Sequence, residues 1–323
     1  MMFELPARWI CATLLAMWAA PALAQQTPLP AQIKIVVPFA AGASTDAAAR
    51  VFATEFAKRT GSTVIVENLP GASTYIGAAA VAKAPKDGSV LLMTSSSTFT
   101  AAATKATVPM DVTTELLPVA LLSEGPIIIG ASLQSDIKTP AELVAAARAK
   151  PDIITHGTGG IGTFSHVVAE LINDAAKIQL KHIPYKGAAL AVPDLVAGRI
   201  DLMIGVYTTI APQVKAGRTR LIAICSREPH PAFPGVPTMA SVVPGLSVEL
   251  WVGFFAPTGT PRAVVQRLNQ ELNEAAKSAA VREAISQDGS LPRAVTPEEF
   301  GAQVRSSYTT WKQLAKDRNI LVD

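Results

Sequence analysis

The chain has 323 residues, with 28 Lys and Arg against 25 Asp and Glu, a formal net charge of +3 and two cysteines. Because this small charge is spread without a basic block, nucleic-acid binding has little electrostatic support. The length suggests two lobes rather than one. So few cysteines exclude a disulfide framework, and the fold has to be stabilised by burial of apolar side chains.

The first 24 residues have the layout of a secretory signal peptide. Arg8 precedes an apolar run over residues 9–20, and residues 22–24 form an A-x-A cleavage site. The run is shorter than the roughly 20 residues that a membrane span needs. A buried N-terminal helix is the alternative interpretation. We expect cleavage after Ala24, export to the periplasm, and a mature chain whose one cysteine, Cys225, lies in the core.

Strands and helices alternate at the start of the mature chain. Residues 33–39 form an apolar run that predicts a strand buried on both faces. Apolar residues then recur every four positions, which predicts an amphipathic helix that Ser44 or Thr45 caps and Gly61 ends. Further strands are predicted over 64–66 and 90–94, with a helix between them over 76–84.

The same alternation restarts in the middle of the chain. Residues 139–142 form a capping box with proline at the first helical position, which opens a helix to Lys150. Strands are predicted over 153–156, 178–185, 201–206 and 220–225, and residues 246–255 are apolar again. Helices are predicted over 164–175 and from Thr260-Pro261 and Thr296-Pro297 onward.

These two series predict an α/β protein with two lobes, each a mostly parallel sheet flanked by helices. We expect residues 25–124 and 248–323 to form lobe 1 and residues 125–247 to form lobe 2. The chain would cross between the lobes near 122–128 and near 244–251.

Two hydroxyl-bearing segments follow predicted strands, where open α/β sheets bind ligands. Residues 38–46 combine small side chains with the start of a helix, whose unpaired N–H groups attract an anion. The alternative is that Ser44, Thr45 and Asp46 only cap that helix. Residues 95–98 form a run of hydroxyls that donates to a carboxylate or is simply a solvated loop.

A glycine-rich segment over residues 156–166 raises the alternative of a dinucleotide site. Gly157, Gly159 and Gly162 match G-x-G-x-x-G between a strand and a helix. The next predicted strand, however, ends in no acid to hold a ribose hydroxyl, and a signal peptide directs the chain away from free NAD. The glycines more simply form a second anion cradle that faces the first across a cleft.

No pattern in the sequence indicates catalysis or a metal site. His156 and His166 flank the glycine-rich segment, but no third ligand lies at a metal-like spacing. No G-x-S-x-G elbow occurs, and no Ser-His-acid triad is legible. We therefore predict a binding protein with no catalytic residues, no metal and no cofactor.

Several different short motifs are spread along the whole mature chain. They lie at 36–39 with Gly42, Asp46 and Arg50, at 66–68, 70–72, 84–88 and 91–93, and at 156–166, 183–187, 214–218 and 236–238. In this order they resemble the Bug-type solute receptors of tripartite tricarboxylate transport systems. The resemblance implies a two-lobed periplasmic-binding-protein fold, type II-like, that closes on a small carboxylate and delivers it to transporter membrane components.

By this resemblance the segments at 42–46 and 158–163 become the leading ligand contacts. The predicted ligand-binding residues are Phe39, Ala41, Gly42, Ser44, Thr45, Asp46, Ser96, Ser97, Thr158, Gly160, Ile161, Gly162, Thr163 and Tyr207. We expect the receptor to act as a monomer.

The choice of carboxylate depends on four side chains. Ile161, Phe164, Val206 and Tyr207 are apolar or aromatic where many family members are polar, which favours an aromatic or aliphatic carboxylate over amino acids and citrate. Two alternatives stay open: an exported dinucleotide-dependent oxidoreductase, and a ligand sensor that presents its closed form to a signalling protein.

Overall fold

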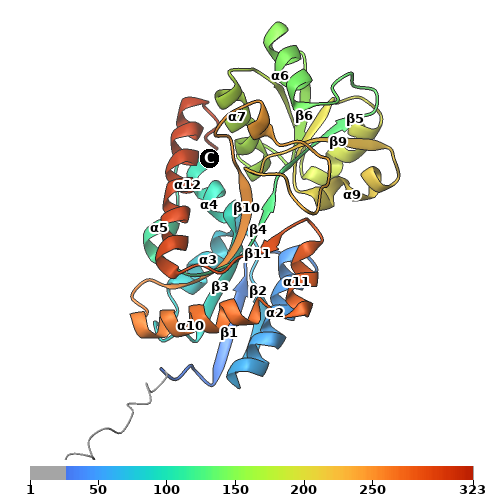
Figure 1. Cartoon of the computed structure of the whole chain (residues 1–323). Coiled ribbons are helices and arrows are strands. Elements are labelled where there is room, and N and C mark those ends of the chain that lie inside the picture. The colour runs from blue at the N-terminus through green and yellow to red at the C-terminus, as the bar shows by residue number, and fades with distance from the viewer. Residues whose placement is uncertain (1–26, 323) are drawn as a thin grey trace, which may run out of the picture.

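The computed structural model describes residues 27–322, so the predicted signal peptide lies outside the described residues. Figure 1 shows two α/β lobes, each built around its own sheet, with helix α12 (Pro297–Asp317) running along the first lobe up to the second. The predicted two-lobed α/β fold is confirmed. Among residues 27–322, none of the helices has the length and hydropathy to cross a membrane.

The first lobe contains a six-stranded sheet with helices on both faces. The strand order is β11-β4-β10-β3-β1-β2. The strands are β1 (Gln32–Val37), β2 (Thr63–Asn68), β3 (Val90–Ser95), β4 (Leu116–Pro126), β10 (Glu249–Pro257) and β11 (Leu291–Pro292). Helices α2 (Ser44–Thr60), α10 (Arg262–Ala275) and α11 (Ala279–Ser286) pack on one face. Helices α3 (Tyr75–Ala82), α4 (Ser96–Thr104), α5 (Val112–Glu115) and α12 pack on the other.

The second lobe contains a five-stranded sheet in the order β7-β6-β8-β5-β9. The strands are β5 (Ile128–Ser132), β6 (Thr155–Thr158), β7 (Lys181–Pro184), β8 (Leu202–Gly205) and β9 (Thr219–Ile224). Helices α6 (Pro140–Ala149) and α7 (Phe164–Ala176) cover one face, and α8 (Val192–Val196) and α9 (Tyr207–Lys215) cover the other.

Both sheets are mixed, which corrects the expectation of mostly parallel sheets. β10 lies antiparallel to β3 and β4, and β5 lies antiparallel to β8 and β9. Each of these strands arrives directly from the other lobe. It therefore enters its sheet without the helical crossover that would return the chain to a parallel direction.

The chain passes between the two sheets twice. It leaves the first sheet at Pro126 and enters the second at Ile128, and it returns between Ile224 and Glu249. Figure 1 shows β4 and β10 side by side where the lobes meet. The lobe limits at 124/125 and 247/248 stay a prediction.

Several predicted boundaries shift for identifiable reasons. The strand predicted over 153–156 begins at Thr155, because the ladder with β7 starts there and Ile153 is 60% exposed. Residues 95–98, expected to be a loop, contain the start of α4: the Ser95 hydroxyl accepts a bond from Ser97 N and so initiates a helix.

The predicted helix caps are confirmed in part. α6 begins with the Thr–Glu capping box predicted from the sequence, α12 begins at the predicted Thr296-Pro297 with a capping box of its own, and Gly61 ends α2 in a left-handed conformation. The prediction that Ser44 or Thr45 caps α2 is wrong: Ala43 stands at the N-cap and no side chain bonds the first turn.

Candidate functional site: an apolar cavity between the lobes

A cavity of about 920 Å³ lies between the two lobes. Its walls come from the starts of α2, α4, α7 and α9, from β4 and β10 and from α11. Apolar side chains form much of the wall, among them Phe39, Leu122, Ile161, Phe164, Leu250 and Ile285. The cavity therefore combines apolar surface with several helix starts.

Charged groups are scarce in this cavity. Among the described residues that line it, Lys105 is the only cation, and Glu283 and Asp288 bring negative charge at the α11 end. No arginine of residues 27–322 lines the cavity, so a carboxylate would find no bidentate guanidinium partner there. An anion in this site has to be held chiefly by backbone N–H and hydroxyl groups.

Half of the sequence-predicted contacts line the cavity. These are Phe39, Ser44, Thr45, Ser97, Ile161, Gly162 and Thr163. The other predicted contacts are not part of this lining: Ala41, Gly42, Asp46, Ser96, Thr158, Gly160 and Tyr207. Of this second set, Gly42, Asp46, Thr158, Gly160 and Tyr207 have structural partners, described below.

The loop before α2 is braced from behind by a carboxylate. Asp46 is 3% exposed and its Oδ2 accepts a hydrogen bond from Gly42 N at 2.8 Å, while Arg50 bonds both carboxylate oxygens and Asn68 donates to Oδ1. Burial opposes ionisation, but these bonds hold the pKa of Asp46 below its usual value. Asp46 therefore fixes the loop, and the N–H groups of the first helical turn stay without a side-chain cap.

The glycine-rich loop uses several of its own donors internally. Gly162 N donates to His166 Nδ1 at 3.1 Å, and Gly160 N donates to Thr158 Oγ1 at 3.2 Å. These two backbone N–H groups, expected to hold the ligand, are thus already bonded. The first turn of α7 begins at Thr163 with no side-chain cap, and its N–H groups lie at the cavity wall.

Helix α9 provides a third uncapped start at the cavity. Its N-cap is Val206, no side chain bonds its first turn, and Thr208 and Thr209 line the cavity. Tyr207, predicted to contact the ligand, instead packs edge-on against Phe233 with ring centroids 4.9 Å apart. Helical geometry turns successive side chains by about 100°, so the residues after Tyr207 face the cavity instead.

The three serines at 95–97 differ in whether they line the cavity. Ser95 and Ser97 line the cavity, but Ser96 is fully buried and its hydroxyl has no hydrogen-bond partner among the described residues. The run of hydroxyls is thus neither a solvated loop nor a uniform set of donors. The helical conformation turns successive side chains by about 100°, so Ser96 points into the protein while Ser97 faces the cavity.

Sequence reasoning missed a strained segment that lines the cavity. Ala72, Ser73 and Thr74 are consecutive non-glycine residues with positive φ angles of 46°, 53° and 78°. Ser73 and Thr74 contribute to the cavity wall. Such backbone conformations cost about 1–3 kcal/mol each and cluster at ligand sites. The residue types at 72–74 do not predict these positive φ angles.

A stack of three histidines lies behind the glycine-rich loop. His182 lies between His166 and His156, with ring centroids 3.9 and 5.0 Å apart. His182 Nε2 is 2.6 Å from the hydroxyl of Thr158. Burial, the dominant cause, lowers the pKa of His156 to about 3 and that of His166 to about 4, so the rings are neutral near pH 7.

These rings support the loop. They stack face to face, so their nitrogens do not converge, and no cluster of three or more His, Cys, Asp or Glu in residues 27–322 is arranged to hold a metal ion. The sequence shows His156 and His166 near the loop, but His182 reaches it only through the parallel pairing of β6 with β7.

Comparison with known proteins assigns the family. Residues 48–320 match the model of the tripartite tricarboxylate transporter family receptor. The chain belongs to this family. It is 31% identical to the protein BugT of Bordetella pertussis over 302 residues, which cover 93% of this chain and 92% of BugT. This tripartite transporter receptor is therefore a solute-binding protein, as the motifs predicted.

Solved structures of relatives share the fold. The protein MatC of Rhodopseudomonas palustris, solved with bound malate, is 30% identical with a TM-score of 0.71, covering 88% of this chain and 98% of MatC. A second R. palustris protein, solved with adipate, is 27% identical with a TM-score of 0.74, covering 90% of this chain and 98% of that protein. The two relatives were thus solved with a dicarboxylate each.

Proposed function

We propose that this receptor captures a small organic carboxylate in the periplasm and delivers it to the membrane components of a tripartite tricarboxylate transporter. The observation that carries the proposal is the convergence of three uncapped helix starts, of α2, α7 and α9, on one apolar cavity with a single lysine. Open N–H groups and helix dipoles at such positions attract anions.

The carboxylate is held by N–H groups of the first turns of α2 and α7, with hydroxyls of Ser44, Thr163 and Thr209 nearby. The two helices belong to different lobes, so a ligand bonded by both joins the lobes. Each lobe alone would leave the anion exposed to water. Binding and lobe closure are therefore coupled, as in other two-lobed receptors that close by a hinge.

The remainder of the ligand is an aromatic or alkyl group. Ile161, Phe164 and Val206 line the cavity, as do Leu250 and Val252 of the strand that returns from the second lobe. Burial against such side chains contributes about 25 cal/mol per Å² of apolar surface. An α-ammonium or several hydroxyls would lose hydration here with few polar partners. The adipate found with one relative is an alkyl dicarboxylate of this kind.

A thermal-shift screen tests the ligand class. The panel contains benzoate and adipate against aspartate, glutamate and citrate, each at concentrations up to 10 mM. A ligand at one hundred times its Kd adds about 2.7 kcal/mol to the free energy of unfolding. We expect benzoate- or adipate-type acids to raise the melting temperature most. Tighter binding of aspartate, glutamate or citrate would refute the apolar-pocket assignment.

A further inference from the structure

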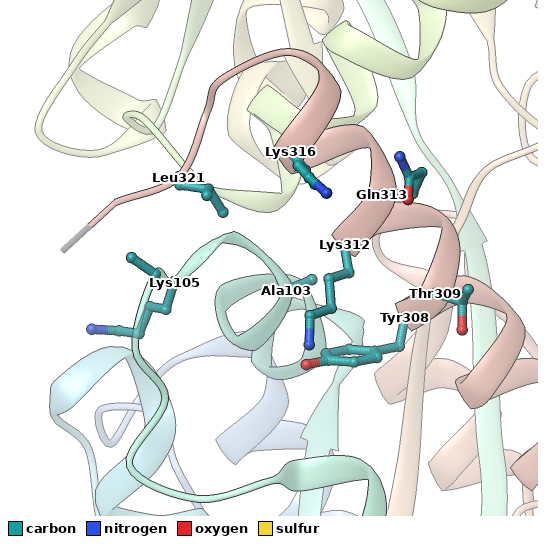
Figure 2. Close-up of a pocket in the computed structure, with 9 residues that line it drawn as sticks. Ala103, Lys105, Tyr308, Thr309, Lys312, Gln313, Lys316 and Leu321 are labelled. Atoms are coloured by element: carbon teal, nitrogen blue, oxygen red, sulfur yellow. The ribbon is translucent and has the colours of Figure 1, made fainter.

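A second hollow, of about 370 Å³, lies on the surface beside the C-terminal helix. Figure 2 shows Tyr308, Lys312 and Lys316 on α12, across from Lys105, which follows α4. Leu321 of the C-terminal segment forms a further part of the wall. This hollow, which we call the α12 groove, is separate from the ligand cavity except at Lys105, which lines both.

The α12 groove is basic and has an aromatic floor. Lys105, Lys312 and Lys316 take part in none of the ion pairs within residues 27–322, in which the lysines used are Lys34, Lys58, Lys177 and Lys277. The ammonium group of Lys312 lies 5.6 Å from the ring centroid of Tyr308, over its face, as Figure 2 shows. Asp317, on the next turn of α12, accepts a bond from Gln313.

Residues next to the walls of this groove contact the ligand site. Thr104, next to Lys105, donates its hydroxyl to the carbonyl oxygen of Gly162 at 3.0 Å, in the glycine-rich loop of the other lobe. Val322 N in turn donates to Thr104 O at 2.8 Å. Val322 also lies so close to Gly162 that a Cβ there would meet its methyl at 3.2 Å.

Helix α12 touches the second lobe as well. The indole of Trp311 packs edge-on against Phe164, the first residue of α7, with ring centroids 5.9 Å apart. Arg318 approaches the carboxylate of Glu170 at 3.5 Å, farther along α7. The α12 groove is therefore built from first-lobe elements at the points where they bond the loop and helix that line the ligand cavity. Its shape depends on how the two lobes meet.

We propose that the α12 groove docks an acidic segment of the transporter's membrane components, and docks it more tightly when the lobes have closed on ligand. This inference rests on the function proposed above. Three unpaired lysines around an aromatic floor are complementary to a segment that carries two or more carboxylates beside an apolar side chain. The interlobe contacts through Thr104 and Trp311 let the same segment distinguish loaded from empty receptor.

The concave form of the groove favours a protein segment over a membrane surface. A bilayer with anionic lipids would also attract lysines, but it presents a surface that does not enter a hollow. A protruding loop does enter, and it can place a side chain against Tyr308 while its carboxylates meet the surrounding ammonium groups.

The test measures binding of the mature receptor to the membrane components of its transporter in nanodiscs of neutral phosphatidylcholine, with and without saturating carboxylate. The variant Lys312→Glu with Lys316→Glu reverses both charges on α12. We expect it to bind the nanodiscs at least about tenfold more weakly. Its carboxylate Kd, measured by calorimetry, should stay within twofold of wild type. Wild-type binding should weaken steeply with added salt.

The matched control reverses two lysines elsewhere. Lys150 and Lys181 are exposed on the second lobe and unpaired in the described structure, so Lys150→Glu with Lys181→Glu changes the net charge equally. Equal weakening by both double variants, or no weakening by the α12 variant, overturns the proposal. The proposal is also overturned if the wild-type receptor binds only anionic nanodiscs that lack the membrane components, or if it binds no nanodiscs at all. If wild type binds no carboxylate in the calorimeter, the proposed function itself has failed.

Discussion

Two of the helix starts at the ligand cavity, those of α2 and α7, differ from the outer starts of α6 and α12, which do not line the cavity. α6 and α12 each begin with a capping box in which a threonine and a glutamate bond two backbone N–H groups. α2 and α7 begin at Ala43 and Thr163 with no side-chain cap. A side-chain cap stabilises a helix by about 1 kcal/mol. The open starts are less stable by about that amount, and their N–H groups stay available to an anion.

The supports behind these starts differ too. The outer caps are exposed threonine–glutamate pairs, whereas the open starts rest on buried polar groups: Asp46 under the α2 loop and the histidine stack under the α7 loop. The cavity is thus preorganised by side chains that do not face the ligand. Stability and binding are therefore controlled by different residues, and substitutions can separate the two.

The largest effect is expected from acid. The pKa values of His156 and His166, about 3 and about 4, lie below their ordinary value, so between pH 6.5 and 4 the unfolded chain binds protons that the folded chain does not. These groups leave stability unchanged above pH 7. They reduce it as the pH falls from 6.5, by up to about 1.4 kcal/mol per pH unit for each histidine.

Urea unfolding at pH 7, 6, 5 and 4 measures this effect, and His166→Gln is the control. Glutamine keeps an acceptor for Gly162 N but cannot titrate, so its stability should fall less steeply with pH. The aspartates whose pKa is lowered titrate alike in both proteins, so their contributions cancel in the difference between the two stability profiles. Parallel pH profiles for the two proteins would contradict the role of the stack.

The next effect comes from capping α2. The backbone of Ala43 is extended, with φ −66° and ψ 158°, and so accommodates an N-cap aspartate. Ala43→Asp supplies the missing cap and places a negative charge where the ligand carboxylate binds. We expect carboxylate affinity, measured by calorimetry, to fall at least about 100-fold, about 2.7 kcal/mol. The free energy of unfolding should rise by about 1 kcal/mol.

Ala43→Asn is the matched variant, because it caps without charge. Its affinity should fall less than that of the aspartate variant, while its gain in stability is similar. If Ala43→Asp binds the carboxylate as wild type does, the start of α2 does not hold the ligand.

The smallest effect is expected at an outer cap. Thr296→Ala removes the hydroxyl that accepts from Glu299 N at 3.1 Å. We expect the free energy of unfolding to fall by about 1 kcal/mol, with ligand affinity unchanged within twofold. Thr139→Ala on the second lobe should behave in the same way. A large loss of affinity in either variant would show that outer caps and ligand site are not independent.

Local signals allowed the sequence to predict much of the fold. The capping box at 139–142, the helix start at Thr296-Pro297 and the helix end at Gly61 depend on neighbouring residues only, and these helix ends are placed correctly. The direction of β10 depends instead on its route from the other lobe. No local pattern reports that route, and the expectation of mostly parallel sheets was therefore wrong.

The candidate site was predicted less completely than the fold. Loop composition located the starts of α2 and α7 at the cavity, but it did not show that Gly160 N and Gly162 N are bonded within the loop. His182 and Val322 reach the glycine-rich loop through tertiary contacts alone. Tyr207 illustrates the remaining difficulty, because a one-residue change of helical phase moves a side chain from the cavity to the core.

The most direct test compares an acid with its primary amide. Once the screen has identified a ligand, isothermal titration calorimetry at pH 7.5 measures both compounds against wild-type receptor. If open N–H groups at helix starts hold a carboxylate, the amide, which has lost the charge and one acceptor, should bind at least about 100-fold more weakly. An amide that binds as tightly as the acid would contradict the account.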